Sequence, residues 1–388
     1  MPSTPHPEER KRTLAAEHFD RTGSPEDARR LVSLIAGRSR RPVQIMEFCG
    51  GHTHAILKYG LRHVLPQTVM LLSGPGCPVC VTARADIDTA IALASTPGVI
   101  LATFGDMMRV PGSDGTLLAS RAQGADVRVV YSSRNALDIA RSNPGRQVVF
   151  LGIGFETTAP TVAAAVQEAE KAKAENFSVL SLHKLTPPAM KAVLESGRVR
   201  IDGIIGPGHV TTIIGAAAWD FLPRDYGIPC AIAGFEPLDI LHAIYSLVDM
   251  IERRQPAVSN TYARSVDARG NRTAQNLMAT VFETCEASWR GLGRVPRSGL
   301  ALRPEYAAFD AAVRFATQVA PPPRPSEEAP KGCRCGEILR GVAVPTQCPL
   351  FGAACTPERP VGPCMVSSEG ACAAYIRYGY GDGHGGTA

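Results

Sequence analysis

The sequence predicts an α/β fold with two similar parallel-sheet domains, followed by a C-terminal domain that is helical and irregular. Short apolar runs alternate with helical patterns at the interval of a β-α unit, which is typical of parallel sheets covered on both faces. Glycine-rich turns recur after these runs in both halves of the chain. The pattern changes beyond residue 250, and six cysteines crowd into residues 333–372.

The elements can be placed in order from these runs. Ser24-Pro-Glu-Asp is typical of a helix start, and a helix is expected to continue through residues 28–35. Eight apolar runs then predict strands, each followed by a turn and a helical pattern. The runs cover residues 43–48, 68–72, 99–103, 127–131, 148–151, 178–182, 201–205 and 229–233.

An internal echo suggests that the two α/β domains are related. The Gly-Pro-Gly turn at residues 74–76 recurs at residues 206–208, and similar turns follow the strands at 99–103 and 229–233. Residues 255–318 look helical and mixed, and a proline-rich segment follows. The expected division is a polar arm at 1–25, α/β domains at 26–140 and 141–252, and a C-terminal domain at 253–388.

Composition and charge exclude several classes of function. The net charge is +5 in 388 residues, and the basic residues are scattered, which argues against nucleic acid as a partner. No apolar run approaches the ~20 residues of a membrane span. The N-terminus lacks the apolar core of a signal peptide, so a cytoplasmic location is expected. In that reducing compartment, 11 cysteines indicate ligands or reactive thiols more than structural disulfides.

The first reactive candidate is Cys77-Pro-Val-Cys80. It follows a strand and a Gly-Pro-Gly turn and precedes a helical pattern, so both cysteines are expected at a helix N-terminus. The helix dipole and free N–H groups stabilise a thiolate there. Two cysteines at this spacing can close a disulfide or hold a metal together. The alternative is a pair of buried, inert thiols.

The second candidate is Cys49-Gly-Gly-His52-Thr-His54, also at a predicted strand end. Open α/β sheets bind their ligands at such ends, and glycines allow the backbone to approach a bound group. Cys49 offers a soft thiolate, and the histidines offer imidazole for metal binding or proton transfer. Either histidine could instead be an ordinary helix-start or core residue. We expect the turns around Cys49 and Cys77 to meet and form one thiol site.

Residues 152–160 are a weaker candidate. They resemble a glycine-rich phosphate loop but lack the third glycine of the dinucleotide fingerprint and the lysine of a P-loop. Thr158 before Pro160 is better interpreted as a helix cap with proline in the first turn. A nucleotide-binding protein is therefore the weakest functional alternative. Cys230 and Cys285 are expected to be structural.

The C-terminal cysteines suggest a metal centre that would stabilise a segment too irregular to form its own core. Zinc sites usually bring cysteines in close pairs, whereas the gaps here are wide. An iron–sulfur cluster held by four cysteines fits this spacing as well or better, and zinc remains the alternative. The six cysteines are Cys333, Cys335, Cys348, Cys355, Cys364 and Cys372.

Taken together, the motifs resemble one family, the [NiFe]-hydrogenase maturation factor HypD family. The matches are CGGHTH at 49–54, GPGCPVC at 74–80 and GFETTAP at 154–160. The fourth match is a C-x12-C-x6-C-x16-C block, and Cys333 and Cys364 lie outside it. Its cysteines are Cys335, Cys348, Cys355 and Cys372.

The resemblance implies a specific role. Members of this family carry a [4Fe-4S] cluster at the C-terminal block and form a complex with a small partner, HypC, which offers its own cysteine. The complex is the scaffold on which iron receives its ligands as Fe(CN)2CO. Cyanide comes from HypE as a thiocyanate, and the iron group then passes to the hydrogenase large subunit precursor.

Within this role, each candidate residue receives a task. Cys49 is expected to bind the iron, and His52 to orient ligands or handle protons. Cys77 and Cys80 are expected to be a redox pair that also touches the iron, with a resting state that the sequence leaves open. The protein would then be a redox-active assembly scaffold rather than a conventional enzyme. The alternative is a thiol–disulfide oxidoreductase that uses its cluster to reduce a protein disulfide.

Overall fold

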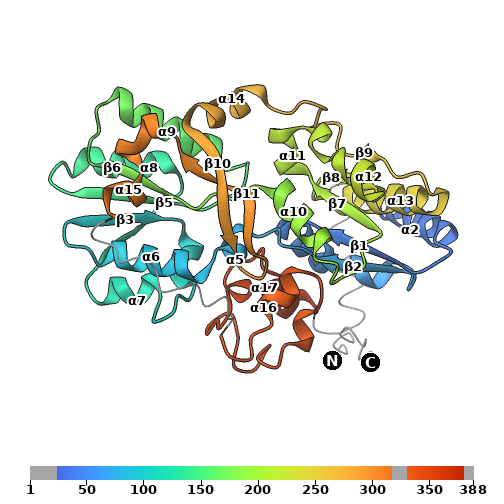
Figure 1. The fold of residues 1–388 in the computed structure, drawn as a ribbon. Helices are drawn as coiled ribbons and strands as arrows, with labels where there is room; N and C mark the ends of the chain where they lie inside the picture. Colours follow the sequence, from blue (N-terminus) through green and yellow to red (C-terminus); the bar gives the residue numbers. More distant parts are fainter. Residues whose placement is uncertain (1–23, 317–329, 380–388) are drawn as a thin grey trace.

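The computed structural model describes residues 24–316 and 330–379, and in it two parallel sheets flank a small cysteine-rich domain (Figure 1). The polar arm predicted before residue 24 lies outside the described residues. So do the proline-rich segment up to 329 and the glycine-rich tail from 380. In the described parts, no helix is both long enough and apolar enough to cross a membrane.

All eight predicted strands are present and fall into two sheets with strands in parallel. The first sheet has the order β2 (Val69–Ser73), β1 (Val43–Glu47), β7 (Gly203–Pro207), β8 (Cys230–Ala233) and β9 (Val258–Asn260). The second has the order β4 (Asp126–Val129), β3 (Val99–Thr103), β5 (Gln147–Gly152) and β6 (Phe177–Ser181). The predicted fold class of two parallel-sheet α/β units is confirmed.

The two sheets do not follow the predicted boundary between residues 140 and 141. Both β4, before that boundary, and β5, after it, pair with β3. The second sheet is thus one insertion between β2 and β7 of the first. Each sheet joins two β-α-β units, β1-β2 with β7-β8 and β3-β4 with β5-β6. In each, the first strands of the two units lie side by side at the centre. The halves do resemble each other, but their strands are divided differently between the sheets.

Helices cover the faces of both sheets because their apolar stripes match the buried strands. Helix α2 (Pro25–Arg38) begins with a capping box at Ser24, as the sequence predicts, and packs with α13 (Pro237–Arg253) against the first sheet. On the second sheet, α8 (Ser133–Ser142) and α9 (Ala159–Lys171) share one core with β3, β5 and β6.

The segment after residue 255 is less helical than expected. After α14 (Arg272–Val281) the chain forms an antiparallel hairpin of β10 (Phe282–Trp289) and β11 (Gly293–Leu302). Next, α15 (Ala311–Arg314) packs against β6. Residues 253–316 therefore belong to the sheets and the hairpin, and only residues 330–379 form the separate cysteine-rich domain.

The cysteine-rich domain holds two short helices, α16 (Cys335–Leu339) and α17 (Ala371–Tyr378), joined by turns. It contacts both sheet units: Arg109 Nη1, after β3, donates to the Pro357 carbonyl at 2.9 Å. His54, after β1, contacts the Ser368 carbonyl at 3.3 Å. The domain therefore lies beneath the junction of the two sheets (Figure 1).

Candidate functional site

The predicted meeting of the two glycine-rich turns is confirmed. Strands β1 and β2 are parallel neighbours that end in register at Glu47 and Ser73. The Gly74 N–H donates to the Glu47 carbonyl at 2.8 Å, and the Gly50 N–H donates to the Gly76 carbonyl at 2.9 Å. These backbone bonds hold Cys49 and the segment that leads to Cys77 against each other.

Glycine is required at residue 76 by this close approach. A Cβ atom there would lie 2.3 Å from both the Cα and the N of Cys49, where backbone cannot move aside. At Gly51, on the other side of Cys49, a Cβ would lie 3.0 Å from the Phe235 ring. The Cys49 backbone is therefore enclosed, which fixes the direction of its thiol.

Cys49 lies where the order of the first sheet reverses, because β1 and β7 are adjacent and their chains continue in opposite directions along the sheet. Ligand sites of open α/β sheets form at such switch points. His209, on α11 (Gly208–Ile214) after β7, faces it: Cys49 Sγ lies 3.8 Å from His209 Nδ1 and 3.9 Å from Nε2. A thiol and an imidazole from two strands thus converge.

The structure separates the two histidines of the first motif. His52 is fully buried on α3 (Gly50–Lys58), and its Nε2 donates to the Gly234 carbonyl at 2.9 Å. Its Nδ1 is buried without a hydrogen-bond partner. The His52 ring stacks on Phe235 at 4.8 Å, and His209 packs on the same ring at 5.0 Å. His54 instead contacts the cysteine-rich domain, at the Ser368 carbonyl.

Burial keeps this site close to electrically neutral at physiological pH. It raises the pKa of the Cys49 thiol, with the Glu369 carboxylate adding to the rise. It lowers the pKa of His52 and of His209 to about 4 each, and it raises the pKa of Glu47 to about 8. Neutral imidazole and a thiol that loses its proton on coordination suit an incoming metal cation.

Cys77 and Cys80 form a disulfide on the single helical turn α5 (Pro78–Val81). The helix at whose start the sequence predicts them, α6 (Arg84–Ala94), is a separate element that begins beyond the pair. The Cys80 N–H donates to Cys77 Sγ at 3.2 Å. Both residues are buried, and Cys80 Sγ lies 3.9 Å from the Pro363 carbonyl of the cysteine-rich domain. The pair therefore lies between the Cys49 turn and that domain.

The six C-terminal cysteines all line one apolar cavity with Ile338, Phe351, Gly362 and Met365. Their soft thiols and apolar surroundings suit an iron–sulfur cluster. Cys335 Sγ lies 2.7 Å from Cys364 Sγ, so these two sulfurs touch each other. In the described residues, no group of three or more His, Cys, Asp or Glu side chains is arranged to hold a single metal ion.

The GFETTAP segment has a structural role at the start of α9. The Glu156 carboxylate accepts hydrogen bonds from the Thr186 N–H at 2.8 Å and from its hydroxyl at 3.1 Å, which ties two helix starts together. Thr158 occupies the cap position before Pro160 but makes no side-chain capping bond. The proline placement is confirmed, but the capping bond expected of Thr158 is absent. The Glu156 carboxylate bonds instead to the start of α10 (Thr186–Glu195).

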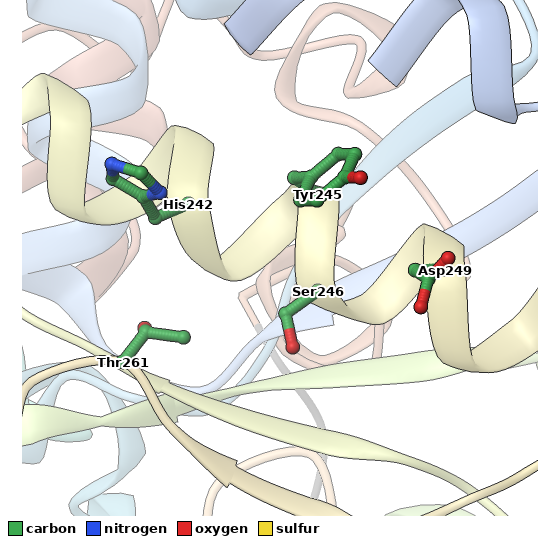
Figure 2. Close-up of a pocket in the computed structure, with 5 residues that line it drawn as sticks. All are labelled: His242, Tyr245, Ser246, Asp249 and Thr261. Carbon is green, nitrogen blue, oxygen red and sulfur yellow. The ribbon is translucent and has the colours of Figure 1, made fainter. Parts of the chain in front are cut away.

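A surface pocket on the first sheet unit is unrelated to these sites. It is lined by four residues of α13 and by Thr261 after β9 (Figure 2). Asp249 is already paired with Arg38 and Arg253, and the Ser246 hydroxyl bonds Ser259. None of the site residues predicted from the sequence reaches it.

His209 is the site residue that sequence reasoning did not assign. Its only signal is the repeated Gly-Pro-Gly turn, in which His209 occupies the position that Cys77 has in the first copy. The echo placed it after a strand, but only the pairing of β1 with β7 brings it to Cys49.

The fold and the site define an α/β protein with a cysteine–histidine pair at a switch point and a separate cysteine-lined domain. Comparison with known families is consistent with this class. The profile of the HypD family, described as "Hydrogenase formation hypA family", matches residues 26–379. The chain therefore belongs to the HypD family.

Named relatives cover nearly the whole chain. It is 52% identical to the hydrogenase maturation factor HypD2 of Bradyrhizobium diazoefficiens, over 88% of this chain and 90% of the relative. It is 47% identical to the HypD of Rhodobacter capsulatus, over 90% and 93%. The HypD of Escherichia coli is 46% identical, over 91% and 94%.

Gly76→Ala should loosen the contact between the two turns. The added methyl group would overlap the Cys49 backbone, so we expect the free energy of unfolding to fall by about 1–3 kcal/mol. Chemical denaturation measures this. Gly145→Ala is the matched control, because a Cβ there meets nothing within 4 Å. Equal stability of the two variants would contradict the enclosed geometry.

Glu156 should make stability depend on pH. Burial raises the pKa of Glu156 to about 7 from an ordinary value of 4.5, so the folded protein holds a proton that the unfolded chain releases between these values. Stability from this proton is present below pH 4.5 and lost as pH rises to 7. Relative to Glu156→Gln, the wild type should lose up to about 3 kcal/mol across that range. If the free energies of unfolding of the wild type and Glu156→Gln change equally with pH, Glu156 does not carry the raised pKa.

Proposed function

We propose that this protein acts in [NiFe]-hydrogenase maturation as the scaffold on which iron acquires its cyanide and CO ligands. The observation that carries the proposal is the buried Cys49 thiol 3.8 Å from the His209 imidazole, at the switch point of the first sheet. A soft thiolate beside imidazole suits a low-spin iron. HypC would supply a second cysteine, HypE the cyanide, and the hydrogenase large subunit precursor would receive the product.

Each residue has a task in this proposal. Cys49 binds the iron, which is cargo rather than a resident cofactor. His52 bonds Gly234 through Nε2, so its buried Nδ1 is left to orient a ligand or to accept a proton. His209 faces Cys49 from the end of the neighbouring strand β7, where its neutral imidazole offers a second ligand for the iron.

The thiol pair supplies electrons for cyanide transfer. Breaking the sulfur–carbon bond of a thiocyanate to give a thiolate and cyanide anion takes up two electrons. Oxidation of the Cys77 and Cys80 thiols to a disulfide releases two electrons and two protons, so the two reactions balance. The disulfide in this structure corresponds to the state after transfer. Contact of these sulfurs with the iron would require the reduced pair.

The cavity of the cysteine-rich domain fits a resident [4Fe-4S] cluster, which would supply electrons. Cys348, Cys355 and Cys372 are proposed ligands. The sequence spacing favours Cys335 as the fourth, but its sulfur already contacts Cys364. We therefore propose that Cys333 takes this place and that Cys335 and Cys364 form a thiol pair beside the cluster.

A cytoplasmic location accompanies the proposal, because reduced thiols and thiol-bound iron require a reducing compartment. The second candidate function is a cluster-dependent thiol–disulfide oxidoreductase. It is favoured by the Cys77–Cys80 disulfide lying against the cysteine-rich domain, at Pro363. It needs no iron at Cys49.

Cys49→Ala should abolish the infrared CN and CO stretching bands of the complex purified with HypC. The substitution removes the proposed iron ligand. Cys285→Ala, at a half-buried cysteine of the hairpin, is the control and should retain the bands. Bands of full strength in Cys49→Ala would exclude the iron role. Their absence from the wild-type complex would favour the oxidoreductase.

The cluster ligands can be identified from iron and sulfide content after purification without oxygen. The wild type should be brown, with about four irons per chain. We expect Cys333→Ala to lose this iron and Cys335→Ala to keep it, because the Cys335 sulfur is occupied by Cys364. Loss of iron in Cys335→Ala but not in Cys333→Ala would instead make Cys335 the fourth ligand, as the sequence spacing favours. Stoichiometric zinc without sulfide would exclude a cluster.

A further inference from the structure

The tip of the β10–β11 hairpin joins the redox pair to the cysteine-rich domain. On one side, the Arg290 N–H donates to the Val81 carbonyl at 2.8 Å, and Arg290 Nε donates to the Thr82 carbonyl at 3.0 Å. These acceptors directly follow Cys80. The hairpin is therefore bonded to the segment that carries the disulfide.

The other side of the tip contacts the cysteine-rich domain just as closely. Gly291 has a φ of +84°, and a Cβ there would lie 2.7 Å from the Cα of Gly336, the residue after Cys335. Arg340 Nη1 donates to the Gly291 carbonyl at 2.8 Å. One residue of the tip thus touches the disulfide segment, and the next touches the helix that begins at Cys335.

The hairpin tip is held firmly in this position. Trp289 is buried, and its Nε1 donates to the Ser298 hydroxyl at 2.8 Å. Its ring stacks on Phe155 with 6.0 Å between centroids. Lys184, also buried, donates from Nζ to the Ser288 carbonyl at 2.8 Å. The backbone position from which the Arg290 side chain extends is therefore fixed.

Arg290 is a buried cation with incomplete hydrogen bonding. Only 9% of it is exposed, and one of its Nη atoms is buried without a partner. Burial lowers the pKa of its guanidinium, whereas the thiols of Cys335 and Cys364 act to raise it. A buried unpaired charge is strongly unfavourable, so an anion is required nearby.

The surrounding charges leave an excess of positive charge. Arg84 and Arg340 each have a guanidinium nitrogen that is also buried without a partner. The nearby carboxylates are shared among several cations: Asp86 Oδ2 lies 3.7 Å from Lys184 Nζ and its charge also acts on Arg290, and Glu337 pairs with Arg334. Thiolates in the cysteine-lined cavity are a further source of negative charge for Arg290.

We propose that Arg290 is the counter-cation of the cysteine-lined cavity and raises the reduction potential of the groups within it. Reduction of a disulfide between Cys335 and Cys364 takes up two electrons. With two protons it gives two thiols, and with one proton it gives one thiol and one thiolate. A fixed cation stabilises the more negative, reduced form. Net charge and hydrogen bonding also set the reduction potential of an iron–sulfur cluster, so a nearby cation raises that potential as well. This inference extends the proposed redox role of the domain.

The test is an anaerobic redox titration of the full-length protein. Dithiothreitol, which becomes its cyclic disulfide, is the reductant for the thiols, and their state is followed by alkylation and mass spectrometry. Cluster absorbance is followed in a separate dithionite titration. In Arg290→Gln the equilibrium constant for reduction should fall about tenfold, about 30 mV for the two-electron thiol couple. Arg290→Lys keeps the charge and should stay near the wild type.

The controls separate charge from structure. Arg294→Gln removes an exposed arginine of the same hairpin and should leave the potential unchanged. Arg84→Gln removes a neighbouring cation outside the hairpin, so it tests the proposal even if Arg290→Gln does not fold. Arg84→Gln should lower the equilibrium constant for reduction by a smaller factor than Arg290→Gln does.

Potentials that are unchanged in both Arg290→Gln and Arg84→Gln would overturn the inference. So would an equal shift in Arg290→Lys and Arg290→Gln, which would indicate a structural role. Protein without iron or sulfide would count against the proposed cluster alone, because the thiol titration would still measure the effect of Arg290.

Discussion

The contact between two backbone turns, Gly76 against Cys49, is the constraint on which the site depends. Parallel strands β1 and β2 end side by side. Their turns can touch only because Gly76 has no side chain to separate it from the Cys49 backbone. This contact fixes Cys49 with little dependence on the more flexible side chains around it. It also sets where α5 begins and hence where the Cys77–Cys80 disulfide lies. The proposed iron ligand and the proposed redox pair are thus placed by one backbone geometry.

The interleaved chain path supplies the second half of the site. Because the second sheet is inserted between β2 and β7, the central strands of the first sheet come from distant parts of the chain. Their ends bring His209 to Cys49, with Phe235 between His209 and His52. The resulting burial keeps the thiol and the imidazoles neutral. A metal cation that binds the thiol of such a site displaces the thiol proton.

Local features of this protein could be predicted from its sequence, and long-range pairing could not. All eight apolar runs became strands, and the motifs at Cys49 and Cys77 lie at strand ends, because burial and turn chemistry act over a few residues. The division into sheets was missed because pairing of β1 with β7 leaves no local signal. The hairpin was missed because its strands are irregular and interrupted by a bulge near Cys285. The contact between Cys335 and Cys364 likewise depends on folding of the whole domain.

The hairpin explains why a scaffold of this kind would hold its redox groups in separate units. The first sheet places the proposed iron-binding thiol where the backbone is rigid, whereas an irregular domain can surround a group much larger than one ion. Such units need a connection that transmits charge as well as position. Arg290 provides both, since its backbone N–H and its Nε bond the segment that follows Cys80, while the charges of the cavity thiols act on its guanidinium. Addition of electrons to either group then changes the electrostatic energy of the same buried cation, which couples their redox states without direct contact.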